Sequence, residues 1–164
     1  GMDADSKGVI AVEVTTADWG DAEVFEGLLD QIPEEIAQVS ADGGYDTKGC
    51  HEKIAQRGAR SAIPPRSGAK RWGKGHPRDE ILDAIGEKGE AAWKRESGYH
   101  RRSLVENGMY RLKQLFGGGL ASRSFARQVA EVHCRMVAMN TMASLGMPVS
   151  ERVRIGASAM GMGV

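Results

Sequence analysis

Two short apolar segments with a helix between them place the strongest constraint on how this chain folds. Residues 36–41 and 59–63 have the length of strands, lean apolar and are followed by turn residues, which is typical of buried strands. Between them, Thr47 is a suitable N-cap for a helix that continues through Gln56, and Gly58 is a usual helix terminator. A strand–helix–strand unit predicts two parallel strands joined by a right-handed crossover. The fold class is therefore α/β.

The rest of the chain predicts one further strand and four further helices. Residues 9–16 are short and rich in β-branched side chains, which indicates a strand. Apolar spacing and stop signals predict the helices, over residues 18–29, 79–94, 101–116 and 124–145. The segment 66–77 is basic and glycine-rich without a period, so it is expected to be a loop. We expect residues 1–150 to form one domain and residues 151–164 to be a disordered tail.

The predicted helix over residues 101–116 carries a polar stripe that begins just before it. Tyr99, Arg102, Glu106 and Lys113 are separated by three, four and seven positions. At about 100° per residue, their side chains leave the helix within about a sixth of its circumference. The apolar residues fall on a different arc and are expected to face the core: Leu104, Val105, Met109, Leu112, Leu115 and Phe116. The polar stripe thus places one carboxylate between two cations and a phenol, a surface suited to holding a metal ion beside a phosphodiester.

The net charge of zero hides a strong asymmetry along the chain. Residues 1–46 carry one lysine and twelve acids, whereas residues 94–135 carry nine bases and three acids. From Arg57 to Arg78 there are seven lysines or arginines and no acid. Such a block attracts polyanions with an affinity that falls steeply as salt rises, although by charge alone a solvated loop is the more ordinary interpretation. Trp72, within this block, is equally suited to stacking on a base and to anchoring the loop.

The spacing of the polar stripe resembles the signature around the catalytic glutamate of DDE transposases of bacterial insertion sequences. The likeness extends over residues 93–103 and on from Glu106 to Arg111. A second match, Ala-Asp-Gly-Gly-Tyr-Asp at residues 41–46, resembles the sequence around the family's second catalytic aspartate at a strand end. Further similarity covers residues 63–66 and 120–145, so the resemblance spans about residues 8–150.

This resemblance implies a ribonuclease H-like fold and a catalytic site for cutting and joining DNA. Asp42 and Glu106 would be the catalytic carboxylates and the ligands of Mg²⁺ or Mn²⁺, since magnesium prefers oxygen ligands and two such ions can drive in-line attack on phosphorus. The same likeness favours DNA as the partner of the basic side chains. The implied DNA-binding residues are Tyr99, Arg102, Lys113, Arg66, Lys70 and Arg71. Asp46 is expected to be a cap or turn residue.

A DDE site needs three carboxylates, and only two occur here in a matching context. Asp5 is a candidate for the first aspartate, but residues 3–8 align better with the turn that precedes the family's third strand. We therefore expect a truncated ribonuclease H-like domain with additional C-terminal helices, lacking the first two strands and the first aspartate. Such a fragment is expected to be inactive alone. Unpaired sheet edges would be covered by pairing with another chain, by swapping or by rearrangement of the first strand, and a homo-oligomer is expected.

Two other functions are compatible with the sequence. The chain would alternatively be a non-catalytic DNA-binding or assembly module, as a decayed transposase remnant. A different ribonuclease H-like nuclease, such as a junction resolvase, would need clustered acids near Glu106 in place of the basic stripe. No segment has the roughly 18 apolar residues of a membrane span and no secretory signal is recognisable. We therefore expect a cytoplasmic, nucleoid-associated protein whose partners are transposon ends and target DNA.

Overall fold

The computed structural model of the protein describes residues 1–73 and 75–146. At its centre, strands β1 (Gln38–Ser40) and β2 (Arg60–Ala62) form a parallel two-stranded sheet with Val39 opposite Ser61. Helix α2 (Lys48–Gln56) connects them, and the Thr47 hydroxyl accepts a hydrogen bond from the Cys50 N–H at its start. The predicted strand–helix–strand unit is thus confirmed, and the α/β class is compatible with the structure.

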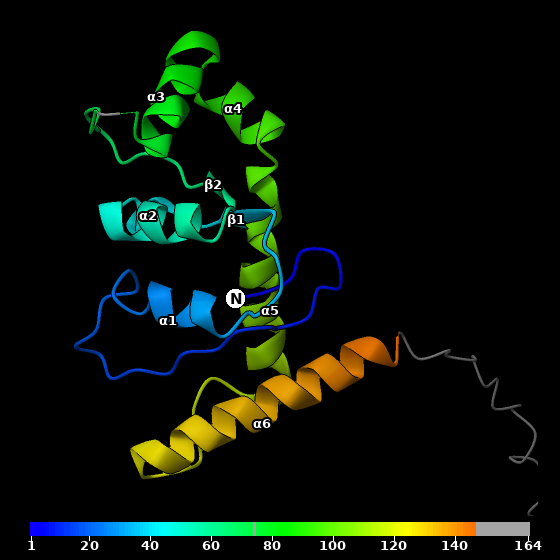
Figure 1. Ribbon diagram of the computed structural model, residues 1–164. Helices are drawn as coiled ribbons and strands as arrows, with labels where there is room; N and C mark the ends of the chain where they lie inside the picture. Colours follow the sequence, from blue (N-terminus) through cyan, green and yellow to red (C-terminus); the bar gives the residue numbers. More distant parts are fainter. Residues whose placement is uncertain (74, 147–164) are drawn as a thin grey trace, which may run out of the picture.

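The other helices surround this unit (Figure 1). Helix α1 (Phe25–Asp30) lies on one side of α2, and α3 (Pro77–Lys88) and α4 (Glu90–Glu96) lie on the other. A 3-10 turn, η2 (Tyr99–Arg102), leads into α5 (Ser103–Phe116), which runs alongside the sheet and α1. Helix α6 (Phe125–Ser144) crosses the end of α5. The expected tail over residues 151–164 lies outside the described residues.

Two predicted helices differ in extent from the observed ones. The helix expected over residues 79–94 is two helices, because Gly89 between them has φ +82°, a left-handed conformation that interrupts the helix. The helix expected over residues 18–29 is confined to α1, and turns occupy most of residues 17–23. In both places the apolar spacing was right for a helix, but the local backbone conformation interrupts one helix and delays the start of the other.

The strand expected over residues 9–16 is wrong. Val9 makes an isolated antiparallel bridge with Met2, and its N–H and carbonyl bond to the side-chain amide of Asn140 on α6, at 2.8 and 2.7 Å. The Val12 N–H donates to the Gln31 side chain at 3.0 Å. Side chains therefore occupy the backbone groups that a neighbouring strand would need. Within the described residues, the segment takes no place in the sheet beside β1.

Helix α5 buries less of its apolar stripe than the sequence predicts. Val105 is 39% exposed, Met109 46% and Leu115 47%, so the expectation that these side chains lie in the core is wrong. Gly108 is the residue of α5 that is buried, and Met2 packs so closely on it that a Cβ there would collide with the Met2 Sδ. The described chain provides too small a sheet to cover the whole apolar face of this helix.

The hydrophobic core lies between α1, α2 and the sheet. Its buried members come from α1, from α2 and from the residue directly after each strand: Phe25, Leu29, Ala41, Cys50, Ile54 and Ile63. Arg57, after α2, closes one end of this core by donating to the carbonyls of Leu29 and Ile32. Tyr45 packs on Phe25 with ring centroids 5.4 Å apart. The core thereby fixes the segment between β1 and α2, which carries Asp42.

A buried ion pair fixes the other side of this segment. Both Asp46 carboxylate oxygens accept from the Arg78 guanidinium, at 2.6 and 2.7 Å, and the two side chains are 1% and 3% exposed. Oδ1 also contacts the buried His51 ring, at 3.2 Å. Burial would raise the pKa of Asp46, but Arg78, the Arg66 N–H and His51 outweigh it and hold the pKa below its ordinary value. Asp46 does end the short 3-10 turn η1 (Gly43–Tyr45), as predicted, and it is also a buried hub.

The basic loop folds back onto this hub through Trp72. The Arg78 guanidinium lies 4.1 Å from the centroid of the Trp72 ring, and His51 and His76 meet that ring edge-on. The Asp79 carboxylate accepts from the Trp72 N–H at 2.9 Å. Trp72 is therefore a loop anchor in this structure, which decides between its two predicted roles.

We expect Asp46→Asn to lower the free energy of unfolding by about 3–5 kcal/mol, because it leaves the buried Arg78 charge without its partner. Urea denaturation measures this change. The control is Glu90→Gln, which removes a surface pair with Lys94 and is expected to cost no more than about 0.5 kcal/mol. An Asp46→Asn protein as stable as the control would contradict the structural role of the pair.

Candidate active site

Asp42 stands two residues beyond the end of β1, at the start of η1. Its side chain is exposed, and Oδ1 accepts a hydrogen bond from the Gly44 N–H at 2.8 Å. A Cβ at position 44 would lie 2.8 Å from the Asp42 Oδ1, so a larger residue there would displace this carboxylate. The turn therefore presents the carboxylate to solvent in one defined orientation.

The second carboxylate, Glu106, lies on the first turn of α5 and pairs with Arg102 one helical turn earlier. The Arg102 Nη1 and Glu106 Oε1 are 2.8 Å apart, and the Glu106 side chain is 61% exposed. The Arg102 guanidinium also lies 5.5 Å from the centroid of the Tyr99 ring. The structure thus brings three of the four residues of the predicted stripe together.

Arg102 also connects this stripe to Asp42. Burial lowers the pKa of Arg102, but Tyr99, Glu106 and the negative charge of Asp42 outweigh this and raise the pKa above its ordinary value. Asp42 is near enough to act on the guanidinium although it follows a different element. Both predicted carboxylates therefore act on one cation.

Two contacts hold the start of α5 against the sheet. The Gln38 side-chain amide on β1 donates to the Ser97 carbonyl, at 3.0 Å, just before η2. Tyr99 packs on the buried Trp93 of α4 with ring centroids 6.0 Å apart. These contacts hold the start of α5 beside β1, so that the charge of Asp42, just after β1, acts on Arg102.

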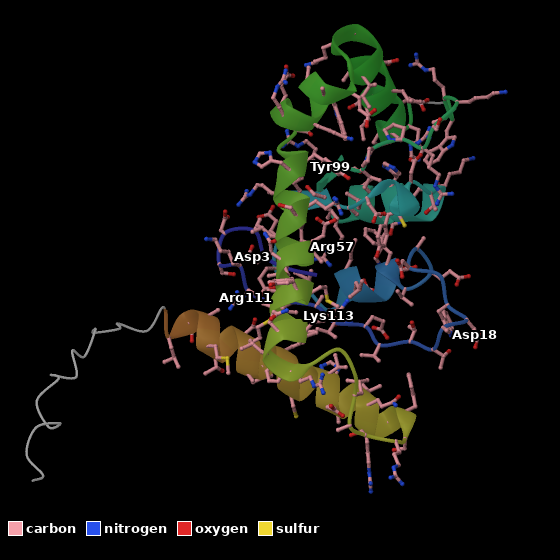
Figure 2. All side chains as sticks on the ribbon, turned by 180° about the vertical axis from the view of Figure 1, so that it is seen from behind. Asp3, Asp18, Arg57, Tyr99, Arg111 and Lys113 are labelled. Carbon is pink, nitrogen blue, oxygen red and sulfur yellow. The ribbon has the colours of Figure 1, made fainter. Side chains whose placement is uncertain are left out.

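Lys113 lies farther along α5. Seven residues separate it from Glu106, which is about 10 Å along a helix axis. Figure 2 shows Tyr99 near the start of α5 and Lys113 near the end of this helix. The Lys113 side chain is exposed. The Lys113 ammonium is thus better placed to contact a neighbouring nucleotide than a phosphate beside Glu106.

The three predicted DNA-binding residues of the basic loop have different surroundings. Lys70 is exposed, and its backbone carbonyl accepts from Arg78 at 2.9 Å. Arg71 pairs with Asp83 on α3, with Nη1 and Oδ1 2.8 Å apart. The Arg66 guanidinium donates to the carbonyls of Gly43 and Gly44, beside Asp42. Of these four predicted DNA-binding cations, Lys70 and Lys113 are therefore better placed to meet a polyanion than Arg66 and Arg71, whose guanidinium groups contact the protein itself.

The donor set suits a hard divalent cation. Asp42 and Glu106 offer carboxylate oxygens, the ligands that Mg²⁺ prefers. In residues 1–73 and 75–146, the protein contacts to these carboxylates involve one oxygen of each: Oδ1 of Asp42 and Oε1 of Glu106. The same ranges contain no cluster of three or more His, Cys, Asp or Glu residues able to hold a metal ion. Asp5, the candidate for the first aspartate, instead pairs with Arg101.

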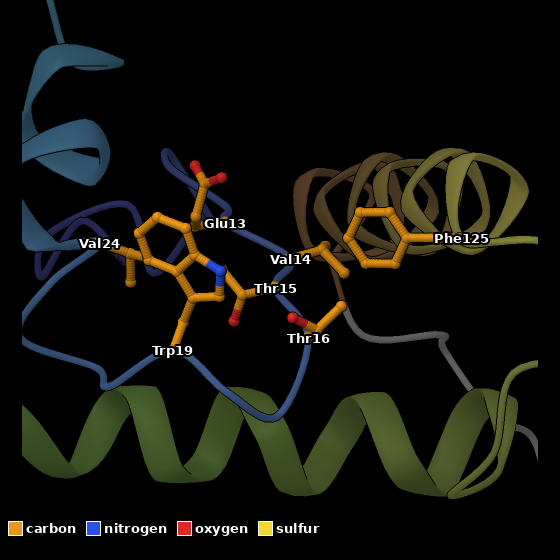
Figure 3. Close-up of a pocket in the computed structure, with 7 residues that line it drawn as sticks. All are labelled: Glu13, Val14, Thr15, Thr16, Trp19, Val24 and Phe125. Carbon is orange, nitrogen blue, oxygen red and sulfur yellow. The ribbon is translucent and has the colours of Figure 1, made fainter.

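An open hollow lies elsewhere on the surface, between the N-terminal segment and the start of α6 (Figure 3). Trp19 and Phe125 contribute its aromatic surface, and both are about half exposed. None of the predicted site residues lines it. The hollow is therefore separate from the carboxylates of Asp42 and Glu106.

A comparison with known protein families shows to which family this chain belongs. The family described as transposase DDE domain matches residues 1–141. The chain belongs to the transposase DDE domain family. The relationship predicted from the sequence is confirmed, and no solved structure matches the chain.

No helix in the described part of this transposase domain is long and apolar enough to cross a membrane.

The most consequential residues of the transposase domain that sequence reasoning missed are those that support the turn of Asp42 and the start of α5. Arg78 appeared only as the end of the basic block, and Gln38 gave no signal. Asp46 offered a partial one, because it is the second acid of the Ala-Asp-Gly-Gly-Tyr-Asp match. A buried acid needs a cationic partner, and the structure shows that the acid-free block provides it through Arg78.

We expect Gly44→Ala to rotate the Asp42 carboxylate away from the turn, since the new Cβ would lie 2.8 Å from Oδ1. Crystal structures of the variant and of the parent protein measure the rotation and the loss of the bond from the residue 44 N–H. The control is Gly49→Ala on α2, where a Cβ meets nothing within 4 Å, so Asp42 is expected to keep its orientation. An unmoved Asp42 in Gly44→Ala would contradict the constraint.

Proposed function

We propose that this chain is the part of a DDE transposase that contributes the carboxylates Asp42 and Glu106 to metal-dependent DNA cleavage and strand transfer. The observation that carries the proposal is the shared cation: Arg102 pairs with Glu106, and its pKa responds to Asp42. Two acids far apart in sequence are thus both near enough to Arg102 for their negative charges to raise its pKa. A ribonuclease H-like fold belongs to the proposal, and the parallel β1–α2–β2 unit supports it.

The two carboxylates would hold the cation from different sides. Asp42 comes from a turn braced by Gly44, and Glu106 comes from a rigid helix, so neither depends on a mobile loop. Mg²⁺ or Mn²⁺, when bound, supplies activation of the attacking oxygen and stabilisation of the leaving one. Arg102 would neutralise charge next to these acids, where the scissile phosphate has to lie.

The DNA would extend from this point along α5 and toward the basic loop. Tyr99 offers a half-buried ring beside Arg102, and Lys113 offers an exposed cation about two turns beyond Glu106. Lys70 and Arg71 would add cations from the loop, although Arg71 would first have to leave Asp83. Contacts of this kind to phosphates set affinity and position and do not read sequence.

A non-catalytic DNA-binding or assembly module is the alternative. The observation that favours it is the Arg102–Glu106 ion pair, because a metal ion must compete with Arg102 for the Glu106 carboxylate. The exposed apolar side chains of α5 also offer surface for a homo-oligomer. In either case we expect negligible strand transfer by this chain alone, since two candidate carboxylates make an incomplete site.

Metal binding tests the catalytic proposal. Soaking with Mn²⁺ is expected to place an ion between Asp42 and Glu106, located by anomalous diffraction. Asp42→Asn and Glu106→Gln should each weaken Mn²⁺ binding by at least about tenfold, measured by electron paramagnetic resonance. The control Glu52→Gln removes an exposed carboxylate from α2 and should leave the affinity unchanged. An ion bound elsewhere, or affinity indifferent to both substitutions, would favour the non-catalytic alternative.

DNA binding gives a second test. The affinity for duplex DNA should fall as salt rises, and Lys113→Gln should reduce the slope of that dependence by about one. Fluorescence anisotropy at several salt concentrations measures the slope. Lys53→Gln is the matched control, because Lys53 already pairs with Glu26 and Asp30 and should leave the slope unchanged. A Lys113→Gln slope equal to that of the control would remove Lys113 from the interface.

A further inference from the structure

We infer that Arg66 is a positioning residue for Asp42, and not the DNA contact that the sequence predicts. The inference deepens the proposed function, because it concerns how the same carboxylate is oriented. It depends on one feature of the turn after β1, where a single peptide group lies between the Arg66 guanidinium and the Asp42 carboxylate.

That peptide group joins Gly43 to Gly44. Its carbonyl oxygen accepts from the Arg66 Nε at 2.9 Å, and its N–H donates to the Asp42 Oδ1 at 2.8 Å. A peptide group is planar and rigid, and in the trans form its oxygen and hydrogen point in opposite directions. Rotation of this unit would break both bonds together. The orientation of the Asp42 carboxylate is therefore coupled directly to the Arg66 side chain.

Arg66 holds the next peptide as well. Its Nη2 donates to the Gly44 carbonyl at 2.7 Å. The Nε and Nη2 of one planar guanidinium thus donate to the carbonyls of Gly43 and Gly44. This forked geometry is available to arginine and not to lysine, whose ammonium is a single flexible point charge.

The backbone of Arg66 is held in return by the same turn. Its N–H donates to the Asp46 Oδ2 at 2.9 Å, and Asp46 is fixed by the buried Arg78 guanidinium. The turn and the loop thus brace one another: the Asp46 side chain fixes the Arg66 backbone, and the Arg66 side chain fixes the backbone of Gly43 and Gly44. Arg66 can hold Asp42 steadily because its own main chain is anchored to a buried group.

Exchange of the Gly44 amide proton with solvent, followed by NMR, tests this inference on the whole chain. Arg66→Gln should speed this exchange by about tenfold or more, because the bond to Asp42 loses its support. Arg66→Lys should speed it as much, since lysine keeps the charge but not the fork. The control Lys70→Gln changes an exposed cation of the same loop and should leave Gly44 exchange unchanged.

A DNA contact predicts the opposite pattern. Arg66→Lys would then resemble the parent protein, and Arg66→Gln would lower the salt dependence of DNA binding by about one phosphate contact without altering Gly44 exchange. Either unchanged Gly44 exchange in both variants or that loss of salt dependence would overturn the inference. If Mn²⁺ does not bind at Asp42, the proposed function fails, whereas the exchange result still reports on the brace itself.

Discussion

The buried ion pair between Asp46 and Arg78 is the interaction on which the rest of this site depends. It joins the turn after β1 to the start of α3, and His51 of α2 and the Trp72 ring pack around it. Removing two charges from water is costly unless each is fully hydrogen-bonded. Here the carboxylate receives Arg78 through both oxygens and the Arg66 N–H in addition, so the pair fixes the geometry of three separate segments.

The candidate site consists of two halves that are braced independently. Asp42 is set by the turn that Arg66 and Asp46 hold, and Glu106 is set by α5. The bond from Gln38 to the Ser97 carbonyl brings the start of α5 beside β1. Arg102 pairs with Glu106, and the negative charge of Asp42 also raises its pKa, so this one cation offsets negative charge from both acids. The same cation is a competitor for any ion that binds there.

The sequence predicted best where the signals were local. Thr47 and Gly58 bounded α2 correctly, and the amphipathic pattern located α5. It predicted worst where distant groups decided the outcome. Residues 9–16 have a strand-like composition, but Asn140 and Gln31 take the backbone groups of Val9 and Val12, and the segment stays out of the sheet. The apolar spacing of α5 likewise predicted the helix correctly, but in the described residues no element covers the whole of its apolar face.

The amino-acid order alone settled the family and the pairing of Arg102 with Glu106, because residues four apart on a helix are neighbours in any fold that keeps the helix. It could not settle what Asp46 and Arg66 do. Asp46 meets Arg78 across 32 positions, and Arg66 reaches Gly44 across 22, so no local rule connects them. Only the packed structure decided that the basic loop turns inward at these points, because the buried Asp46 carboxylate needs partners that water no longer provides.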